Sequence, residues 1–312
     1  MRISGLVVAL AALAGLAVAG VGCAQQGVPL AFKFATGDVL QYDVTLSGAG
    51  GMSAGEGSLT PVSLQGSFSV VQRVTRVLAD GSAQLETRIP RGEITLVFDR
   101  ETARFSYGDG KLRWYANGKE SSPPQGDLSK VLLLGAPLTY TMAPDGLVRD
   151  MVLPAPQVLG GMAKSLPALD PSAIQGMGEA VFPSAPVRVG ETWRKTAQLA
   201  PLGPGFPLSA TVSRTLASFD DRGGIGLAKI TGFAEVRLRG AGSPVFSAQD
   251  VSISVPEIKQ TITSTEFFNA TVGRLLRGDY DLAFSARISA KAGGQEKGGA
   301  LEARLRVSVQ AR

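Results

Sequence analysis

Residues 279–288 read DYDLAFSARI, and this stretch shows the pattern that dominates the chain. Apolar and polar side chains alternate along it with a period of two. That period is typical of an antiparallel strand with one face in a core and the other in water. The same alternation recurs at residues 40–46, 83–89 and 301–309. The sequence therefore predicts a mainly β protein whose strands are long.

Short turn signals separate these stretches. The residue pairs that accept positive φ angles are Asp80-Gly81, Asp109-Gly110, Asn117-Gly118, Asp145-Gly146 and Gly223-Gly224. Tight hairpins need such angles, so neighbouring strands are expected to be antiparallel partners. Residues 48–57 are rich in Gly and Ser, and we interpret them as a flexible hairpin connection. We predict a long curved antiparallel sheet, either a half-barrel or a sandwich.

The chain divides into two similar halves, over residues 31–153 and 185–312. Thr36-Gly37-Asp38-Val39-Leu40 in the first half corresponds to Val189-Gly190-Glu191-Thr192-Trp193 in the second. A long strand, an Asp/Gly turn and another strand follow in each half, with similar spacing. A true duplication and a common hairpin pattern both explain this order, since self-similarity is informative only where its register persists.

Residues 154–184, between the halves, lose the alternation and acquire helical spacing. Two short helices fit, with Asp170 and Pro171 at the start of the second. We expect these helices to pack on the apolar face of the sheet. Their larger apolar side chains are therefore candidates for lining a ligand site: Met162, Leu166 and Met177.

The N-terminal residues have the layout of a bacterial export signal. Residues 3–19 are almost wholly apolar, and Cys23, the only cysteine, follows the small residue Gly22. We expect a signal peptide over residues 1–22, lipid attachment at Cys23 and a tether over residues 23–30. Such a lipoprotein would be exported and anchored to a membrane of the bacterial cell envelope, on the periplasmic or surface side.

Two other interpretations of this N-terminus stay open. Ordinary cleavage after Ala19 or after Ala24 would release a secreted protein. The apolar run could instead be retained as an anchor, since about 20 apolar residues can span a bilayer. In each case the folded part has no thiol pair for a disulfide or a cysteine metal site.

Composition excludes several classes of function. The net charge is only +5, and no stretch gathers the basic residues that nucleic-acid binding requires. The chain has no histidine, which removes Ser-His-Asp and Cys-His catalysis and nearly every zinc site. Asp279 and Asp281 share one strand face and could form a hydrolytic carboxylate pair, but Arg277 and Arg287 on that face favour charge pairing. We expect no enzyme activity, no cofactor and no metal.

Aromatic residues gather around the Asp109-Gly110 turn, with Tyr107 and Trp114 on its two sides. Aromatic side chains can line an apolar pocket or stack on a sugar, and they also stabilise hairpins as cross-strand pairs. Tyr107 and Trp114 are therefore candidate ligand-lining residues, with hairpin packing as the alternative.

Three short elements carry a resemblance to a known family. They are Phe32-Lys33-Phe34 with Gly37-Asp38, then Asp145-Gly146-Leu147-Val148, and the stretch PVRVGETW at residues 186–193. The chain resembles an uncharacterised family of exported bacterial proteins, many of them lipidated, that share a Val-Gly-Asp/Glu-Ser/Thr-Trp element. In architecture alone the predicted chain also resembles periplasmic lipoprotein carriers, lipid-binding half-barrels in which short helices cover a curved sheet. Neither resemblance implies an activity for particular residues.

We therefore expect a non-enzymatic lipoprotein that binds an apolar or amphipathic ligand between the sheet and the helices. The alternative is a structural envelope protein that contacts other proteins or polymers through exposed strands. The expected partners are a membrane, through the lipid anchor, and an apolar ligand, with no nucleic acid. The sequence does not indicate the oligomeric state.

Overall fold

A computed structural model describes residues 27–54, 59–121, 137–152, 182–199, 208–238, 246–248, 251–292 and 295–312. Cys23, Met162, Leu166 and Met177 lie outside these residues, as do the signal peptide and all but the last three residues of the predicted helical segment. Phe182, Pro183 and Ser184 at the end of that segment are not helical.

All regular structure in the described residues is β. The strands are β1 (Val39–Ala54), β2 (Thr60–Val77), β3 (Ala83–Phe98), β4 (Glu101–Gly108), β5 (Lys111–Ala116), β6 (Lys119–Ser121), β7 (Leu138–Met142), β8 (Val148–Val152), β9 (Thr192–Leu199), β10 (Leu208–Arg222), β11 (Ile225–Leu238), β12 (Phe246–Ala248), β13 (Val251–Asn269), β14 (Arg274–Ala292) and β15 (Gln295–Ala311). The prediction of a mainly β protein with long strands is confirmed.

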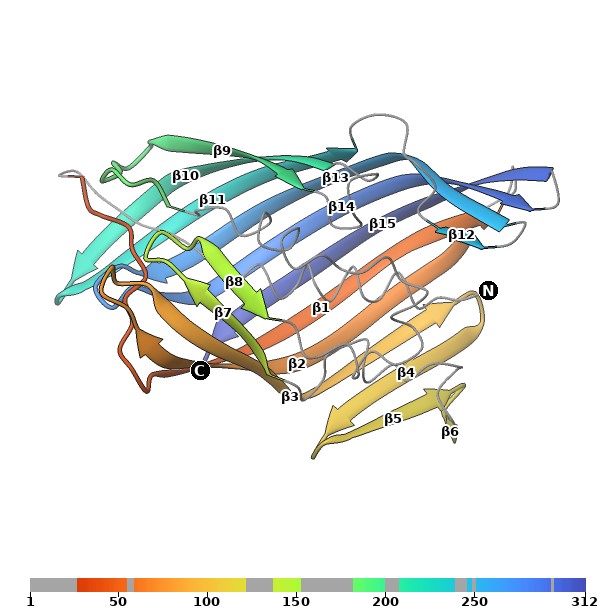
Figure 1. Cartoon of the computed structure of the whole chain (residues 1–312), viewed down its shortest axis with the longest axis horizontal. Coiled ribbons are helices and arrows are strands. Elements are labelled where there is room, and N and C mark those ends of the chain that lie inside the picture. The colour runs from red at the N-terminus through yellow and green to blue at the C-terminus, as the bar shows by residue number, and fades with distance from the viewer. Residues whose placement is uncertain are drawn as a thin grey trace.

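The strands form one 15-stranded antiparallel sheet (Figure 1). Its main path runs β6-β5-β4-β3-β2-β1-β15-β14-β13-β11-β10-β9. The N-terminal strand β1 pairs with the C-terminal strand β15, which joins the two halves of the chain at the middle of the sheet. The sheet is curved and does not close, since the described strands β6 and β9 at its two ends are not paired with each other. This architecture matches the half-barrel prediction and not the sandwich.

The tight turns form where the sequence predicts them. β4 and β5 are joined by Asp109 and Gly110, which have φ angles of 52° and 72°. Asn117 and Gly118 join β5 and β6 in the same way, with φ angles of 48° and 78°. Positive φ at both central residues is the geometry that matches the twist of a two-residue hairpin.

The two halves begin with the same backbone arrangement. In the first half, Gly37 N–H donates to the Val74 carbonyl and Val74 N–H donates to the Asp38 carbonyl, both at 2.9 Å. In the second half, Gly190 N–H donates to the Leu216 carbonyl at 2.8 Å and Leu216 N–H donates to the Glu191 carbonyl at 3.1 Å. Each half therefore starts with a Gly-acid turn tied to a buried residue of the next long strand.

Further details of the two halves agree. The Asp38 carboxylate accepts a hydrogen bond from Ala35 N–H, and the Glu191 carboxylate accepts one from Arg188 N–H, both three residues earlier in the chain. The register of β2 on β3 shifts just after Val74, and that of β10 on β11 shifts just after Leu216. Because turn, pairing and bulge recur in one order, the predicted repeat is present in the backbone of β1–β3 and β9–β11.

The interpretation of residues 48–57 as a hairpin connection is wrong for its described part. Residues 48–54 continue β1 and pair with β15, and residues 48–52 also pair with β2. A Cβ atom at Gly48 would lie only 2.6 Å from the Arg304 carbonyl oxygen, and one at Gly50 would overlap the Glu302 carbonyl oxygen. The glycines are therefore needed where two backbones approach each other closely. A flexible loop would have the same composition, so the sequence alone did not distinguish the two structures.

Candidate functional site

The sheet has one mainly apolar face, which extends from β5 to β10 and ends in Lys119 of β6 at one edge and Lys195 of β9 at the other. We call it the inner face and define it as the face that carries Leu46, Val307 and Leu282. The strand registers align its residues in rows across the main path. One row is Ala116, Ala103, Leu96, Leu64, Gly48, Leu305, Leu282, Ile262, Ala234, Val212 and Lys195. Apart from Lys195 in β9 at the edge, this row contains only apolar side chains and glycine.

The opposite face, here the outer face, is polar and carries ion pairs. Asp281 accepts a hydrogen bond from Arg306 at 2.7 Å, across the β14–β15 pairing. Asp279 pairs with Arg277 at 2.8 Å and also accepts a hydrogen bond from the Ser308 hydroxyl. The two carboxylates that could have formed a hydrolytic pair are thus each held by an arginine. This is the charge pairing favoured by the sequence, although Arg287 pairs with Glu257 instead.

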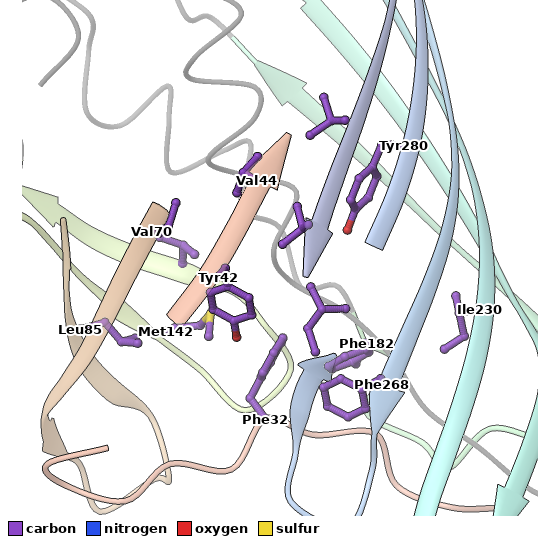
Figure 2. Close-up of a cluster of buried hydrophobic side chains, with 14 of the residues drawn as sticks. Phe32, Tyr42, Val44, Val70, Leu85, Met142, Phe182, Ile230, Phe268 and Tyr280 are labelled. Carbon is purple, nitrogen blue, oxygen red and sulfur yellow. The ribbon is translucent and has the colours of Figure 1, made fainter. Parts of the chain in front are cut away.

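Described segments outside the main path cover one end of the inner face. Phe32 and Phe182 pack against Phe268 of β13, with ring centroids 5.6 and 5.5 Å from it and 5.2 Å from each other (Figure 2). Met142 of β7 and Met151 of β8 are buried in the same core. The hairpin β7–β8 and residues 182–187 therefore belong to the packed end of the inner face.

The N-terminal segment is part of this packed end. Val28 forms an isolated antiparallel bridge with Val187, and the Leu30 side chain is buried. Phe32 N–H donates to the Pro144 carbonyl at 2.7 Å. The described residues of the predicted tether are therefore fixed against the sheet from Val28 onward.

A second row of the inner face includes polar residues at one side. It contains Trp114, Phe105, Ile94, Gly66, Leu46, Val307, Tyr280, Ser264, Gly232, Arg214 and Trp193. Glu266 lies in the adjacent row, between Ile230 and Gly278. We call Arg214, Ser264, Glu266 and Tyr280 the polar cluster.

Glu266 is the fully buried charged residue of the described inner face. Its side chain has 0% exposure, and its Oε2 lies 3.5 Å from Arg214 Nη1, whose side chain is 16% exposed. Its Oε1 has no hydrogen-bond partner among the described residues. Burial raises the pKa of the Glu266 carboxyl, and the nearby Arg214 and Ser264 only partly offset this effect. Burial also raises the pKa of the Tyr280 hydroxyl, and the charge of Glu266 adds to that shift.

The structure places two of the predicted ligand-lining residues on the inner face. Trp114 packs edge-on against Phe105 with ring centroids 4.2 Å apart, and Tyr107 aligns with Gly92 of β3. Both lie toward the β4–β5 end of the sheet, whereas the polar cluster lies toward the other end, on β10, β13 and β14. The predicted hairpin packing is therefore present at Trp114, and the same side chain also faces the apolar rows.

The polar cluster was not predicted, although the sequence holds a signal for it. In β13, Glu266 stands at the alternating position shared with Ile258 and Ile262. In β10, Arg214 stands at the position shared with Val212 and Leu216. A charged residue at an apolar position of the alternation, on two strands, marks a buried polar site.

Comparisons with known proteins add no family. No protein-family model matches the chain, and no curated protein matches it. Among solved structures, an outer membrane channel from Pseudomonas putida F1 aligns over 94% of this chain and 100% of its own, with 8% identity and a TM-score of 0.21. Pseudomonas aeruginosa OccK5 aligns over 88% and 98%, with 8% identity and a TM-score of 0.21. Pseudomonas aeruginosa OpdQ aligns over 88% and 99%, with 5% identity and a TM-score of 0.22.

The part of the chain that the structure describes contains no helix long and apolar enough to cross a membrane. It also contains no group of three or more Cys, Asp or Glu residues arranged to hold a metal ion.

Proposed function

We propose that this chain is a non-enzymatic lipoprotein of the bacterial cell envelope that binds an apolar or amphipathic ligand on its inner face. The observation that carries the proposal is a row of apolar side chains and glycine that runs without interruption from β5 to β10. A contiguous exposed apolar patch of more than a few hundred Å² is rare on a monomeric protein. Leu46, Leu305 and Val307 at the middle of the face are already buried, so the proposed ligand contacts the side chains of the face that are only partly buried.

The side chains along these rows suit a ligand that is long and flexible. Small residues interrupt the larger ones: Gly48 lies between Leu64 and Leu305. Ala234 likewise lies between Ile262 and Val212, so the face is uneven and a flexible hydrocarbon chain can follow it. Several of the larger ones, such as Ile262 and Phe284, are only partly buried. Each buried CH₂ group of a ligand contributes roughly 0.8 kcal/mol, so a long chain can bind by apolar contact alone.

The proposed anchor would keep the inner face close to a membrane. Cys23 is five residues from Val28, the first residue bridged to the rest of the structure. A fully extended chain spans at most about 3.6 Å per residue, which gives a reach of roughly 18 Å. A lipid on Cys23 would therefore hold the packed end of the inner face near the bilayer, where amphipathic molecules are available.

Two neighbouring residues of β10 provide a matched test. Val212 is on the inner face and Ser213 is on the outer face, and both are partly buried. Binding of methyl palmitate to the mature protein would be measured by native mass spectrometry and by displacement of a fluorescent apolar probe. We expect Val212→Glu to weaken binding at least tenfold, because a carboxylate would be buried against hydrocarbon, and Ser213→Glu to leave it unchanged. Wild-type protein that binds neither methyl palmitate nor the probe would overturn the proposal.

The alternative scaffold function depends on exposed strand edges. β6 at one end of the main path carries exposed Lys119 and Glu120, and β9 at the other carries exposed Arg194 and Lys195. Charged side chains on edge strands disfavour pairing with a further strand. We therefore favour ligand binding by the inner face over a scaffold function.

A further inference from the structure

Each half of the chain holds one buried polar pair across a strand of the repeat. In the first half, Gln72 of β2 and Tyr140 of β7 lie on the two sides of β3, and Gln72 Nε2 donates to the Tyr140 hydroxyl at 2.8 Å. In the second half, Arg214 of β10 and Glu266 of β13 lie on the two sides of β11 and meet at 3.5 Å. Both pairs therefore span one intervening strand.

The strand registers show that the two pairs occupy equivalent positions. Two rows correspond, namely Val74, Leu85 and Tyr140 in the first half and Leu216, Ile230 and Glu266 in the second. Gln72 and Arg214 each stand two residues before the first member of their row. The repeat therefore extends to β7 and β13, and it makes Tyr140 the equivalent of Glu266.

The two equivalent residues differ by one hydrogen-bond donor. The Tyr140 hydroxyl also accepts a hydrogen bond from Thr87 Oγ1 at 3.2 Å. The position of Thr87 in β3 corresponds to Gly232 in β11, which has no side chain. Glu266 Oε1 has no hydrogen-bond partner among the described residues. The second half therefore has an unpartnered acceptor where the first half has an internal hydroxyl donor.

The unpartnered oxygen lies next to side chains that are partly exposed. Glu266 itself has 0% exposure, whereas the Arg214 side chain is 16% exposed and Ser264 is only partly buried. Both belong to the adjacent row of the inner face, with Gly232 between them. A ligand on the inner face would therefore approach the Glu266 carboxylate through this row.

The charges of the pair indicate the kind of polar group that fits. Arg214 and Glu266 carry opposite charges, so the pair as a unit has no net charge. An anionic head group would place an acceptor against the acceptor Oε1, and a cationic one would bring a second positive charge beside Arg214. An uncharged hydroxyl brings a donor without an unpaired charge, and a donor is what a buried unpartnered oxygen lacks.

We propose that Glu266 Oε1 forms a subsite for the hydroxyl head group of an uncharged single-chain amphiphile, whose hydrocarbon chain lies along the apolar row. The inference rests on the proposed function and adds the chemical class of the ligand. The ligand hydroxyl donates to Oε1 as the Thr87 hydroxyl donates to Tyr140 in the first half. Arg214 holds Oε2 and so leaves Oε1 to the ligand.

The test compares dodecan-1-ol, 1-methoxydodecane and dodecanoate on the mature protein, by displacement of a fluorescent apolar probe. The alcohol and the ether have the same hydrocarbon chain, but only the alcohol has a hydrogen-bond donor. Because hydrogen bonds to charged groups are stronger than those between neutral groups, we expect the alcohol to bind at least tenfold more tightly than the ether. Dodecanoate, which has no donor, should bind more weakly than the alcohol.

Two double variants locate the preference for the alcohol. Arg214→Met/Glu266→Leu removes the acceptor together with its counter-ion, and should bring the ratio of the two affinities to about one; apolar replacement of both partners of a buried ion pair is generally tolerated. Gln72→Leu/Tyr140→Phe removes the equivalent pair of the first half, whose acceptor is already satisfied, and should keep the tenfold ratio. Retention of the ratio in the first variant, or its loss in the second, would overturn the subsite.

The remaining outcomes separate this inference from the proposed function. Equal binding of alcohol and ether to the wild type would overturn the subsite and leave apolar binding standing. Tighter binding of dodecanoate than of the alcohol would overturn the assignment of an uncharged head group. Binding of none of the three would overturn the subsite and the proposed function together.

Discussion

Glu266 Oε2 lies 3.5 Å from Arg214 Nη1 on the mainly apolar inner face of the sheet. The two residues belong to β13 and β10, with β11 between them. A buried ion pair of this kind contributes little net stability, because removing both charges from water offsets their attraction. Removing one partner, in contrast, is costly, because it leaves the other charge buried without its counter-ion.

The pH dependence of stability tests the environment of Glu266. Its pKa in the folded state is raised by burial above the value of 4.5 expected for an exposed Glu. Between these two values the folded state holds a proton that the unfolded state has lost, so stability falls as pH rises through that window. We expect Glu266→Gln to remove this pH-dependent part of the free energy of unfolding, measured with urea from about pH 4 to pH 8. An unchanged pH profile would show that Glu266 is not buried; Glu235→Gln on the outer face is the control.

Removing only one partner of the ion pair should be worse than removing both. Arg214→Met leaves the Glu266 carboxyl without its cation, and we expect a loss of about 3 kcal/mol at neutral pH. The double variant Arg214→Met/Glu266→Gln should recover most of that loss. The free energies of unfolding are measured with urea for the wild type, Arg214→Met, Glu266→Gln and the double variant. Together they form a double-mutant cycle. Additive losses would mean that the two side chains do not interact.

The packing of Phe182 predicts a large effect at the covered end of the inner face. Phe182 is 1% exposed and contacts the rings of Phe32 and Phe268. Phe182→Ala should destabilise the protein by roughly 3–5 kcal/mol, through lost burial and a cavity. Phe233→Ala on the outer face, where the side chain is 47% exposed, should cost less than about 1 kcal/mol. Similar losses for both variants in thermal unfolding would contradict the placement of residues 182–187.

The close approach of β1 and β15 predicts that Gly48 tolerates no side chain. Gly48→Ala would place a Cβ 2.6 Å from the Arg304 carbonyl oxygen, and we expect a loss of roughly 1–3 kcal/mol from the forced backbone shift. Gly108→Ala is the matched control, because a Cβ there meets nothing within 4 Å. If Gly48→Ala were as stable as wild type in urea unfolding, residues 48–54 would not be paired as a strand.

Much of the sheet could be predicted from local pattern. Alternation located the strands around residues 279–288 and 301–309, and turn chemistry located the hairpins at Asp109-Gly110 and Asn117-Gly118. Both signals are local, because side-chain direction and φ angles depend on a few neighbouring residues. The pairing of β1 with β15 had no such signal, since its two strands lie at opposite ends of the chain.

The remaining differences have physical causes in particular residues. Gly48 and Gly50 suit a loop and a close strand contact equally, so composition alone indicated the wrong structure. Glu266 and Arg214 were detectable as charges at apolar positions, but only a structure shows that they meet across β11. The predictions for Cys23, Met162, Leu166 and Met177 lie outside the described residues and stay predictions.

The most direct test of inner-face binding is covalent mapping of a bound ligand. Palmitate with a diazirine in its hydrocarbon chain would be bound to the mature protein and irradiated, and labelled residues would be located by peptide mass spectrometry. Ile262 and Leu282 face the inner side, and Thr263 and Asp281 face the outer side of the same two strands. We expect label on Ile262, Leu282 and their row neighbours. Label that falls equally on Thr263 and Asp281, or on none of these strands, would contradict ligand binding on the inner face.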